Sequence, residues 1–231
     1  MSKNIVFIVA VKKDGFVKPE YQLSINSWKH FCDKNDCELF LLEEPVLPPE
    51  EMNIILQRYF LFDILEANEI DCPNFFNETE DKYCLVHDDG SYDWVLRGME
   101  HYSEQVYDGY WFDYTKYGNG GFQIVNDKHR DFFKYMRDFY FENADKVNTI
   151  SQTYGVGVDQ TILNFNLNTQ NVDTKLLPYK YNMTCMIKKD ILTIEDMFFT
   201  KVGWVYHFNG IPDKEKNVPF LMKRTYDYLY G

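Results

Sequence analysis

Two adjacent carboxylates at the end of an apolar run are the residues of this chain best suited to chemistry. Asp88 and Asp89 directly follow the run at 83–87, and Gly90 comes next. Paired acids where a strand leaves a sheet pack poorly but supply hard oxygen ligands, which suit Mn²⁺ or Mg²⁺. A plain turn is the alternative, since Asp and Gly are common turn residues. Taken alone, the pair fits either interpretation.

A histidine far downstream offers a further ligand. His207 ends the apolar run 202–207 and is followed by Phe-Asn-Gly, with Gly210 and then Lys214 beyond it. An imidazole added to two acids makes a ligand set suited to a divalent cation. The glycine lets backbone N–H groups approach a phosphate, and the lysine adds a mobile positive charge. The segment by itself also fits a histidine packed at a turn.

Further polar side chains lie in apolar surroundings between these points. Asn119 lies among glycines at the start of an apolar run, which fits either close approach of a ligand or of another chain segment, or simply the entry to a hairpin or loop. Asp159 and Gln160 fall at an expected helix start, where Asp159 is either an N-cap or a partner for sugar hydroxyls. Arg58, on an expected buried helix, is either a cation facing a ligand or a member of an ion pair.

The elements that must position these residues alternate in type. Apolar runs at 5–11, 37–42 and 83–87 predict strands, and helical periodicity predicts helices at 20–34 and 52–67. This β-α-β-α-β order implies a parallel sheet covered by helices. In such sheets, ligands bind outside the carboxyl ends of the strands, where the two acids lie.

The second half of the chain has a mixed pattern. Asp127 is expected to cap a helix. Strands are expected at 109–113, 121–125, 175–177 and 202–207, and helices at 127–144, 158–165 and 219–230.

Composition narrows the class of protein. The chain has 231 residues, enough for one large domain. Its net charge of -12 argues against binding to nucleic acid or to anionic membranes. We expect no integral membrane segment, since no apolar run is long enough, and no signal peptide, which together indicate a cytoplasmic protein. The five cysteines contain no CxxC pair, which favours reduced thiols.

The order of the motifs resembles that of the retaining glycosyltransferases of family 8, the glycogenin group, and related GT-A enzymes. Acids follow the third strand, Asn-Gly-Gly opens a later strand, and Asp-Gln-x-x-Leu-Asn comes next. Leu-Pro with Tyr-Asn follows, and then His-Phe-Asn-Gly with a nearby lysine. The similarity extends over about residues 5–214 as scattered short motifs.

The resemblance implies an α/β protein with a GT-A fold. A single domain at 1–231 would have a Rossmann-like, mostly parallel central sheet flanked by helices and a mixed C-terminal half. Its nucleotide-binding half would be 1–113, and its acceptor and donor-sugar half 114–231. The donor would be a nucleotide-diphosphate sugar, usually a UDP-sugar, bound with Mn²⁺ or Mg²⁺. The acceptor would be a glycan, a glycoprotein or a small molecule, and the anomeric configuration would be retained.

The resemblance also implies roles for individual residues. The metal would be held by His87, Asp89 and His207, the donor by Val9, Arg58, Asp88, Asn119, Gly210 and Lys214, and the anomeric carbon would lie beside Asp159 and Gln160. The chain departs from the family's Asp-x-Asp motif. If Asp89 is the last acid, His87 takes the first position; if Asp88 is the first, Gly90 takes the last. We favour the former register, because the last acid usually does most of the metal binding. The lysine also lies one residue further from the glycine than is usual in the family.

Two other functions stay open. A catalytically inactive GT-A-like domain that binds a sugar or a protein is favoured by the altered metal motif. A sugar nucleotidyltransferase would share the Rossmann-like half, but it usually has a glycine-rich loop with Arg and Lys after the first strand. The segment at 11–15, Val-Lys-Lys-Asp-Gly, matches that loop poorly.

Overall fold

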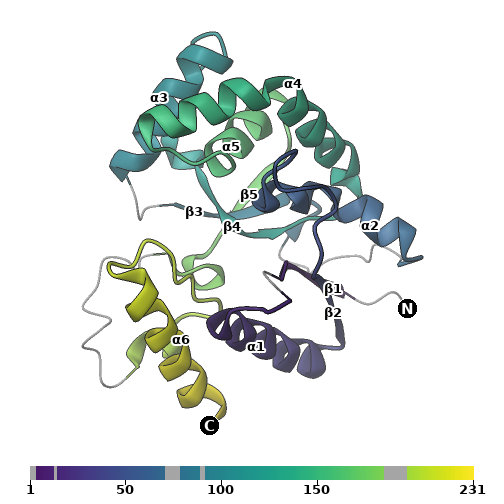
Figure 1. Ribbon diagram of the computed structural model, residues 1–231, viewed down its shortest axis with the longest axis vertical. Coiled ribbons are helices and arrows are strands. Elements are labelled where there is room, and N and C mark those ends of the chain that lie inside the picture. The colour runs from purple at the N-terminus through teal and green to yellow at the C-terminus, as the bar shows by residue number, and fades with distance from the viewer. Residues whose placement is uncertain (1–3, 13–14, 71–78, 89–91, 185–196) are drawn as a thin grey trace. The chain divides into compact units, whose positions relative to one another are not determined.

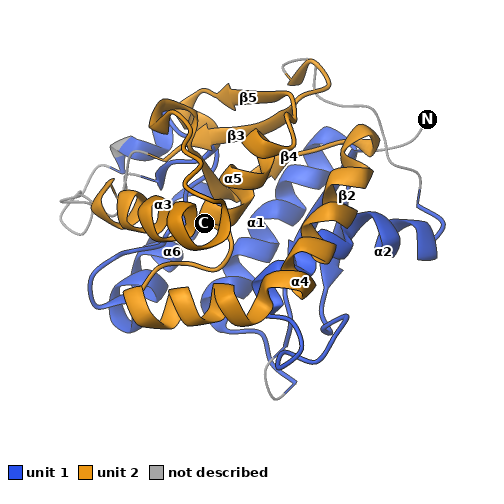
Figure 2. Ribbon diagram, turned by 90° about the horizontal axis from the view of Figure 1, so that it is seen from above, with its two compact units in different colours: residues 1–74, 182–231 blue, residues 75–181 orange. Residues whose placement is uncertain are grey.

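The computed structural model describes residues 4–12, 15–70, 79–88, 92–184 and 197–231 (Figure 1). The chain forms two compact units, which Figure 2 colours separately. Unit 1 comprises residues 1–74 and 182–231, and unit 2 comprises residues 75–181. None of the described helices has the length and apolar character that a bilayer crossing requires.

Unit 1 begins with the β-α-β arrangement that the sequence predicts. β1 (Asn4–Val9) and β2 (Cys37–Leu42) are parallel and paired along their whole length. α1 (Pro19–Asn35) connects them. It begins at a proline, whose fixed φ suits a first helical turn, and it is followed by Asp36 in the left-handed conformation with a φ of 51°.

The second predicted helix, at 52–67, forms as two shorter ones. η1 (Ile54–Phe60) is a 3₁₀ helix, and α2 (Leu61–Ala67) continues from it. The side chain of Gln57 is fully buried and hydrogen-bonds to main-chain groups of Val46, Leu47 and Met52. Helix η1 is thereby attached to the loop that precedes it.

The end of the chain also belongs to unit 1. α6 (Lys214–Tyr230) packs against α1, where Tyr230 stacks on His30 with ring centroids 4.5 Å apart. The predicted helix at 219–230 is therefore confirmed and begins earlier. The predicted strand at 202–207 is wrong, because within the described residues the pairing of this segment is limited to one bridge between Met183 and Tyr206. A short helix, η8 (Phe198–Lys201), precedes it.

Unit 2 is built on a three-stranded sheet. β3 (Tyr83–His87) is central, with β5 (Thr174–Leu177) parallel on one side and β4 (Gly118–Ile124) antiparallel on the other. Residues 83–86 are buried, as expected for a strand covered on both faces. The predicted α/β class is confirmed. The strands are divided between two small sheets, one parallel and one mixed, where the sequence predicts one mostly parallel central sheet.

Helices pack with the sheet of unit 2. They are α3 (Tyr92–Val106), α4 (Arg130–Tyr154) and α5 (Gln160–Thr169). Residues 160–167 of α5 are all buried, so this helix lies inside the unit. Aromatic side chains, 18% of the whole chain, fill much of the interior, and Tyr107 stacks on Phe165 with ring centroids 4.4 Å apart.

The predicted cap of α4 is wrong by one residue. Asn126, and not Asp127, caps η4 (Asp127–His129), the 3₁₀ turn that leads into α4. Its side-chain oxygen accepts a hydrogen bond from the Lys128 N–H, and its own N–H donates to His129 Nδ1. Asn and Asp are equally good caps, so sequence could not choose between adjacent residues.

The predicted strand at 109–113 is also wrong. This segment is an irregular loop that leads into η3 (Tyr114–Lys116), whose start is capped by the Asp113 carboxylate. The Ser103 hydroxyl donates a 2.7 Å hydrogen bond to the Tyr110 carbonyl. A side chain of α3 therefore pairs with a main-chain carbonyl of this loop, which in a strand would be paired with a neighbouring strand.

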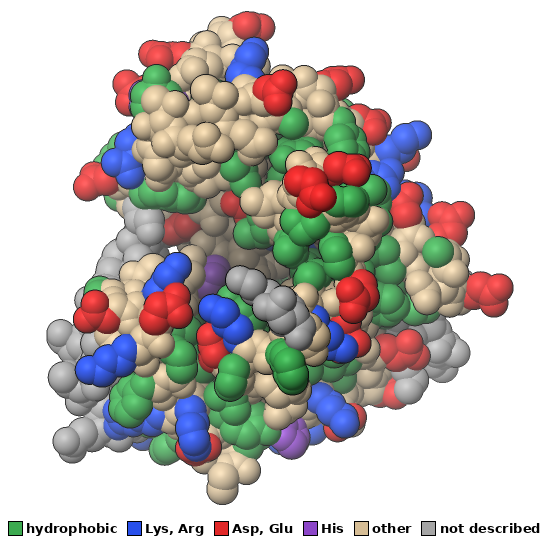
Figure 3. Space-filling view, in the orientation of Figure 1, with side chains coloured by type: hydrophobic (Ala, Val, Ile, Leu, Met, Phe, Trp, Pro, Cys, Tyr) green, Lys and Arg blue, Asp and Glu red, His purple; other side chains and the backbone are tan. Residues whose placement is uncertain are grey.

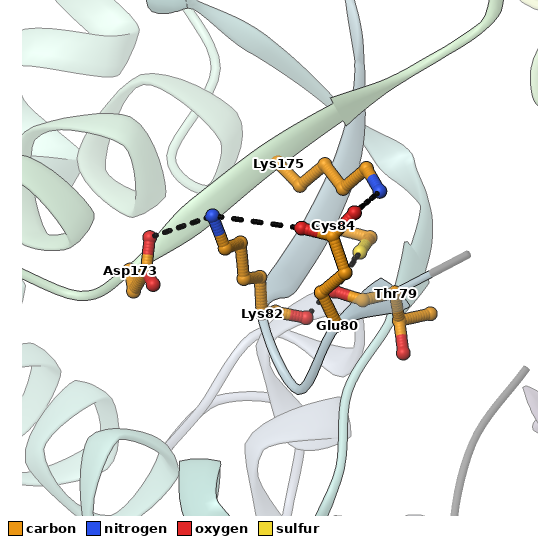
Figure 4. A network of polar contacts seen from close by, with 6 residues as sticks. All are labelled: Thr79, Glu80, Lys82, Cys84, Asp173 and Lys175. Atoms are coloured by element: carbon orange, nitrogen blue, oxygen red, sulfur yellow. Dashed lines mark hydrogen bonds and ion pairs between the residues drawn. The ribbon is translucent and has the colours of Figure 1, made fainter. Parts of the chain in front are cut away.

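Ion pairs join the chain at the amino end of β3, opposite the end that Asp88 follows (Figure 4). Lys175 Nζ lies 2.6 Å from Glu80 Oε1, and Lys82 Nζ lies 3.8 Å from both Glu80 and Asp173. The hydrogen bond from Lys175 lowers the pKa of the Glu80 carboxyl. The acids are exposed and the lysines half-buried, so each pair contributes little to stability. On the face shown in Figure 3, acidic and basic side chains are likewise interspersed.

Candidate functional site

Asp88 is the centre of a buried polar network in unit 2. It follows β3 directly and is only 4% exposed. Its carboxylate oxygen Oδ2 accepts hydrogen bonds from the amide of Asn119, at 3.0 Å, and from the amide of Gln160, at 2.7 Å. Hydrogen bonds to a carboxylate are stronger than those between neutral groups. One carboxylate oxygen thus joins the end of β3 to β4 and to the start of α5.

The main chain of Asp88 is held as firmly as its side chain. Its N–H donates to the Tyr117 carbonyl at 3.1 Å, and its carbonyl accepts a 2.6 Å hydrogen bond from the Tyr114 hydroxyl. Both partners come from the segment that leads into β4. The position of Asp88 therefore depends on long-range contacts, and these are the reason that a buried acid is tolerated here.

The two amides are each oriented at both ends. The Asn119 oxygen accepts the Gly121 N–H at 2.9 Å, and the Gln160 oxygen accepts the Gly120 N–H at 3.0 Å. Their nitrogens donate to Asp88. An amide has one donor end and one acceptor end, so this arrangement is satisfied in only one of its two orientations.

Helix α5 takes the place of a neighbouring strand for part of β4. Asn164 lies one turn after Gln160; its side chain accepts the Gly118 N–H at 2.7 Å and donates to the Gly118 carbonyl at 2.8 Å. Glycine is required at position 118, because an added Cβ would lie 2.6 Å from Cβ and Cδ1 of Leu85. Close packing of β3, β4 and α5 therefore positions the amides around Asp88.

A buried tyrosine completes the network. The Tyr117 hydroxyl lies 2.8 Å from Thr161 Oγ1 and 3.5 Å from the Gln160 amide nitrogen. Burial raises the pKa of the Tyr117 phenol far above its ordinary value. It is therefore neutral and acts as a hydrogen-bonding group.

Asp159 occupies the N-cap position of α5, one of the two roles that the sequence predicts for it, but its side chain makes no capping hydrogen bond. Its carboxylate lies close to the loop before the helix, since a Cβ added at Gly157 would be 3.4 Å from Asp159 Oδ1. It also lies near the buried phenol of Tyr102, whose pKa is raised first by burial and second by the Asp159 charge. Asp159 and Gln160 are neighbours at one helix start, as the sequence indicates.

His87, the last residue of β3, is oriented by the main chain. Its Nδ1 lies 2.9 Å from the Tyr117 carbonyl, so Nδ1 is the donor, and a neutral ring then has its lone pair on Nε2. Metal-binding histidines commonly use the same arrangement, in which the second nitrogen donates to a carbonyl. The ring also packs edge-on against Tyr114, with centroids 5.2 Å apart. His87 therefore fits the role of a metal ligand.

The other acid of the predicted metal motif, Asp89, lies outside the described residues. Within the part of the chain that the structure describes, no three His, Cys, Asp or Glu side chains are grouped so as to hold a metal. Of the predicted metal ligands His87, Asp89 and His207, only His87 is a described residue of unit 2.

The remaining predicted residues fall in unit 1. Val9 ends β1 opposite Leu42, and Arg58 Nε donates to the Ile55 carbonyl at 2.9 Å within η1. His207 is half-buried, and its N–H donates to the Met183 carbonyl at 3.4 Å.

The segment after His207 leads into α6. Gly210 has a φ of 62°, a conformation that favours glycine, and Lys214 is the exposed first residue of the helix. The predicted residues therefore form two sets. Asp88, Asn119 and Gln160 are in direct contact in unit 2, with His87 and Asp159 adjacent in sequence, whereas Val9, Arg58, His207, Gly210 and Lys214 belong to unit 1.

The sequence interpretation missed several residues of the network. Tyr114 and Tyr117 were not singled out, and Asn164 was noted only as the end of Asp-Gln-x-x-Leu-Asn. One local signal was available, since Gln160 and Asn164 are four residues apart and therefore share a helix face. Comparison with known proteins adds no relative: no family model, curated protein or solved structure matches the chain.

Proposed function

We propose that this chain is a metal-dependent glycosyltransferase with a GT-A fold. It moves a sugar from a nucleotide-diphosphate sugar of the UDP-sugar class to a glycan, a protein or a small molecule, with retention of the anomeric configuration. The observation that carries the proposal is the meeting of Asp88, Asn119 and Gln160. Asn119 and Gln160 lie 31 and 72 positions after Asp88, and each of the three belongs to a motif that the resemblance assigns to the donor site.

The residues that would hold the metal are His87, Asp89 and His207. The orientation of His87 supports this assignment, because its Nδ1 donates to a carbonyl and Nε2 is the nitrogen suited to coordination. A Mn²⁺ ion held by these residues would stabilise the diphosphate electrostatically as negative charge develops on it. In this proposal Lys214 adds a second positive charge to the same diphosphate.

The catalytic roles fall to Asp159 and Gln160 at the start of α5. In the reaction, the bond between the anomeric carbon and the diphosphate oxygen breaks, and a bond to the acceptor oxygen forms as the acceptor hydroxyl passes its proton to the leaving diphosphate. Positive charge develops at the anomeric carbon, which a nearby carboxylate stabilises. Asp159 supplies such a carboxylate, and the Gln160 side chain beside it is fixed by Asp88 and Gly120.

The direct test is release of the nucleoside diphosphate from a panel of nucleotide sugars, with Mn²⁺ and with EDTA. We expect release from at least one UDP-sugar with Mn²⁺ and none with EDTA. Asp89→Asn is expected to lower the rate about 100-fold or more, as the loss of metal-site residues commonly does. Asp138→Asn, the same chemical change at an exposed position of α4, is the matched control and is expected to leave the rate unchanged.

The outcomes separate the candidate functions. If no nucleotide sugar is turned over and none raises the melting temperature with Mn²⁺, the proposal is refuted. If a nucleotide sugar raises the melting temperature but is not turned over with any acceptor, the chain is an inactive sugar-binding domain. Proton NMR of the first product tests retention, which is refuted if the opposite anomer forms first.

A further inference from the structure

One oxygen of the Asp88 carboxylate is fully engaged by two side-chain amides. Its Oδ2 accepts two amide N–H groups at 3.0 and 2.7 Å, and the residue is 4% exposed. We propose that Asp88 is a positioning residue, which fixes the orientation of the Asn119 and Gln160 amides in the donor site, and that its Oδ2 is not a ligand of the metal. This inference rests on the proposed function.

The chemistry of the amides supports a positioning role. Asn and Gln side chains can turn over and exchange their donor and acceptor ends. Here Gly121 and Gly120 supply N–H groups to the two amide oxygens, while Asp88 accepts from the two nitrogens. Turning either amide over would place an oxygen against the carboxylate and an NH₂ group against an N–H. Asp88 therefore allows only one orientation.

The same contacts argue against metal binding through Oδ2 of Asp88. A cation at Oδ2 would have to replace two hydrogen bonds to a charged acceptor, and it would meet the positive ends of two N–H dipoles. The adjacent His87 is arranged differently, because its Nδ1 is used by a carbonyl while Nε2 is suited to coordination. The structure thus assigns the neighbouring residues His87 and Asp88 to different tasks.

The first measurement is Mn²⁺ binding in the presence of UDP, monitored through the electron paramagnetic resonance signal of free Mn²⁺. We expect Asp88→Asn to bind Mn²⁺ within about threefold of the wild type, since it removes a neighbouring negative charge but none of the proposed ligands. Asp89→Asn is expected to weaken binding about tenfold or more. If Asp88→Asn weakens Mn²⁺ binding as much as Asp89→Asn does, Asp88 is a ligand and the proposal is overturned.

The second measurement divides the kinetic effect on UDP-sugar turnover. Asp88→Asn is expected to lower kcat about tenfold or more while KM changes by less than about threefold, because misoriented catalytic groups reduce the rate of the chemical step. Ser103→Ala is the control for a purely structural effect, since it removes a buried hydrogen bond elsewhere in unit 2. If this control lowers kcat as much at equal loss of melting temperature, the effect of Asp88 is only structural and the proposal fails.

The third measurement does not depend on activity. Side-chain NH₂ resonances of Asn119 and Gln160, assigned by single substitutions, are expected to shift and to exchange faster with solvent in Asp88→Asn. If these resonances are unchanged, the orienting contact is refuted whatever the protein catalyses. If they change but no nucleotide sugar is turned over by the wild type, the proposed function fails while the orienting role of Asp88 stands.

Discussion

The replacement of Asn164 by leucine tests how α5 holds β4, and the structure sets its magnitude. The Asn164 side chain is 1% exposed and pairs with both main-chain groups of Gly118. Leucine has a similar shape but no polar atoms, so the N–H and the carbonyl of a buried residue both lose their partners. An unpaired buried polar group costs about 1–3 kcal/mol, so we expect Asn164→Leu to lower the free energy of unfolding by about 3 kcal/mol after the gain from the apolar side chain.

A matched control lies one turn further along the same helix. Asn168 is half-buried, and its amide donates a 2.8 Å hydrogen bond to the Asn164 carbonyl, an acceptor in the interior of a helix. Because such a carbonyl already accepts a main-chain hydrogen bond, Asn168→Leu is expected to cost less than about 1 kcal/mol.

Urea unfolding followed by circular dichroism measures both changes. For a chain of this size, about 3 kcal/mol lowers the melting temperature by about 6–12 °C. Hydrogen exchange at the Gly118 amide gives a local readout, and exchange is expected to accelerate in Asn164→Leu only. The reasoning is refuted if Asn164→Leu is within about 0.5 kcal/mol of the wild type, or if Asn168→Leu is equally destabilising.

Further predictions concern packing, pH, thiol reactivity and surface charge. Gly118→Ala is expected to lower the free energy of unfolding by about 1–3 kcal/mol through overpacking against a leucine of β3. Gly120→Ala, whose Cβ would meet its nearest atoms at 3.7 Å, is expected to lower it less. Equal losses of stability in urea unfolding would contradict this. Burial raises the pKa of Cys84 to about 11, so the folded state favours the thiol. The contribution of Cys84 to stability is therefore complete below about pH 9 and is expected to be lost as pH rises to about 11. Cys84→Ala should flatten the fall in melting temperature over that range. For the same reason Cys84 is expected to resist alkylation by iodoacetamide at pH 8 until urea unfolds the protein, and rapid labelling of the native protein, read by mass spectrometry, would refute its burial. Lys175→Met removes the exposed pair with Glu80 and is expected to change stability by less than about 0.5 kcal/mol, with the difference from wild type vanishing in 1 M salt.

Local patterns account for most of the elements that were predicted correctly. The apolar runs at 37–42 and 83–87 form strands, and the periodic segment at 20–34 forms a helix, because periodicity of apolar residues is a property of the segment itself. The segments at 109–113 and 202–207 are also apolar and aromatic, but they are not strands. A strand needs a partner, and the partner is set by residues distant in sequence.

The candidate site divides in the same way. The types of Asp88, Asn119 and Gln160 and their polar character in apolar surroundings were visible in the sequence. Their mutual contacts were not, because the hydrogen bonds join residues 31 and 72 positions apart. Tyr117 and Asn164 carried no comparable signal, since a buried tyrosine or asparagine is recognised by its partners and not by its neighbours in the chain.

By itself the sequence determined that an acid pair follows a buried strand and that amide side chains follow in a definite order. Only the tertiary structure decided what the first acid does. Asp88 accepts hydrogen bonds from two side-chain amides because β3, β4 and α5 pack closely enough to bury it. Gly118 permits this close approach. A buried carboxylate needs hydrogen-bond donors, and its donors come from wherever the fold places them, which no local pattern specifies.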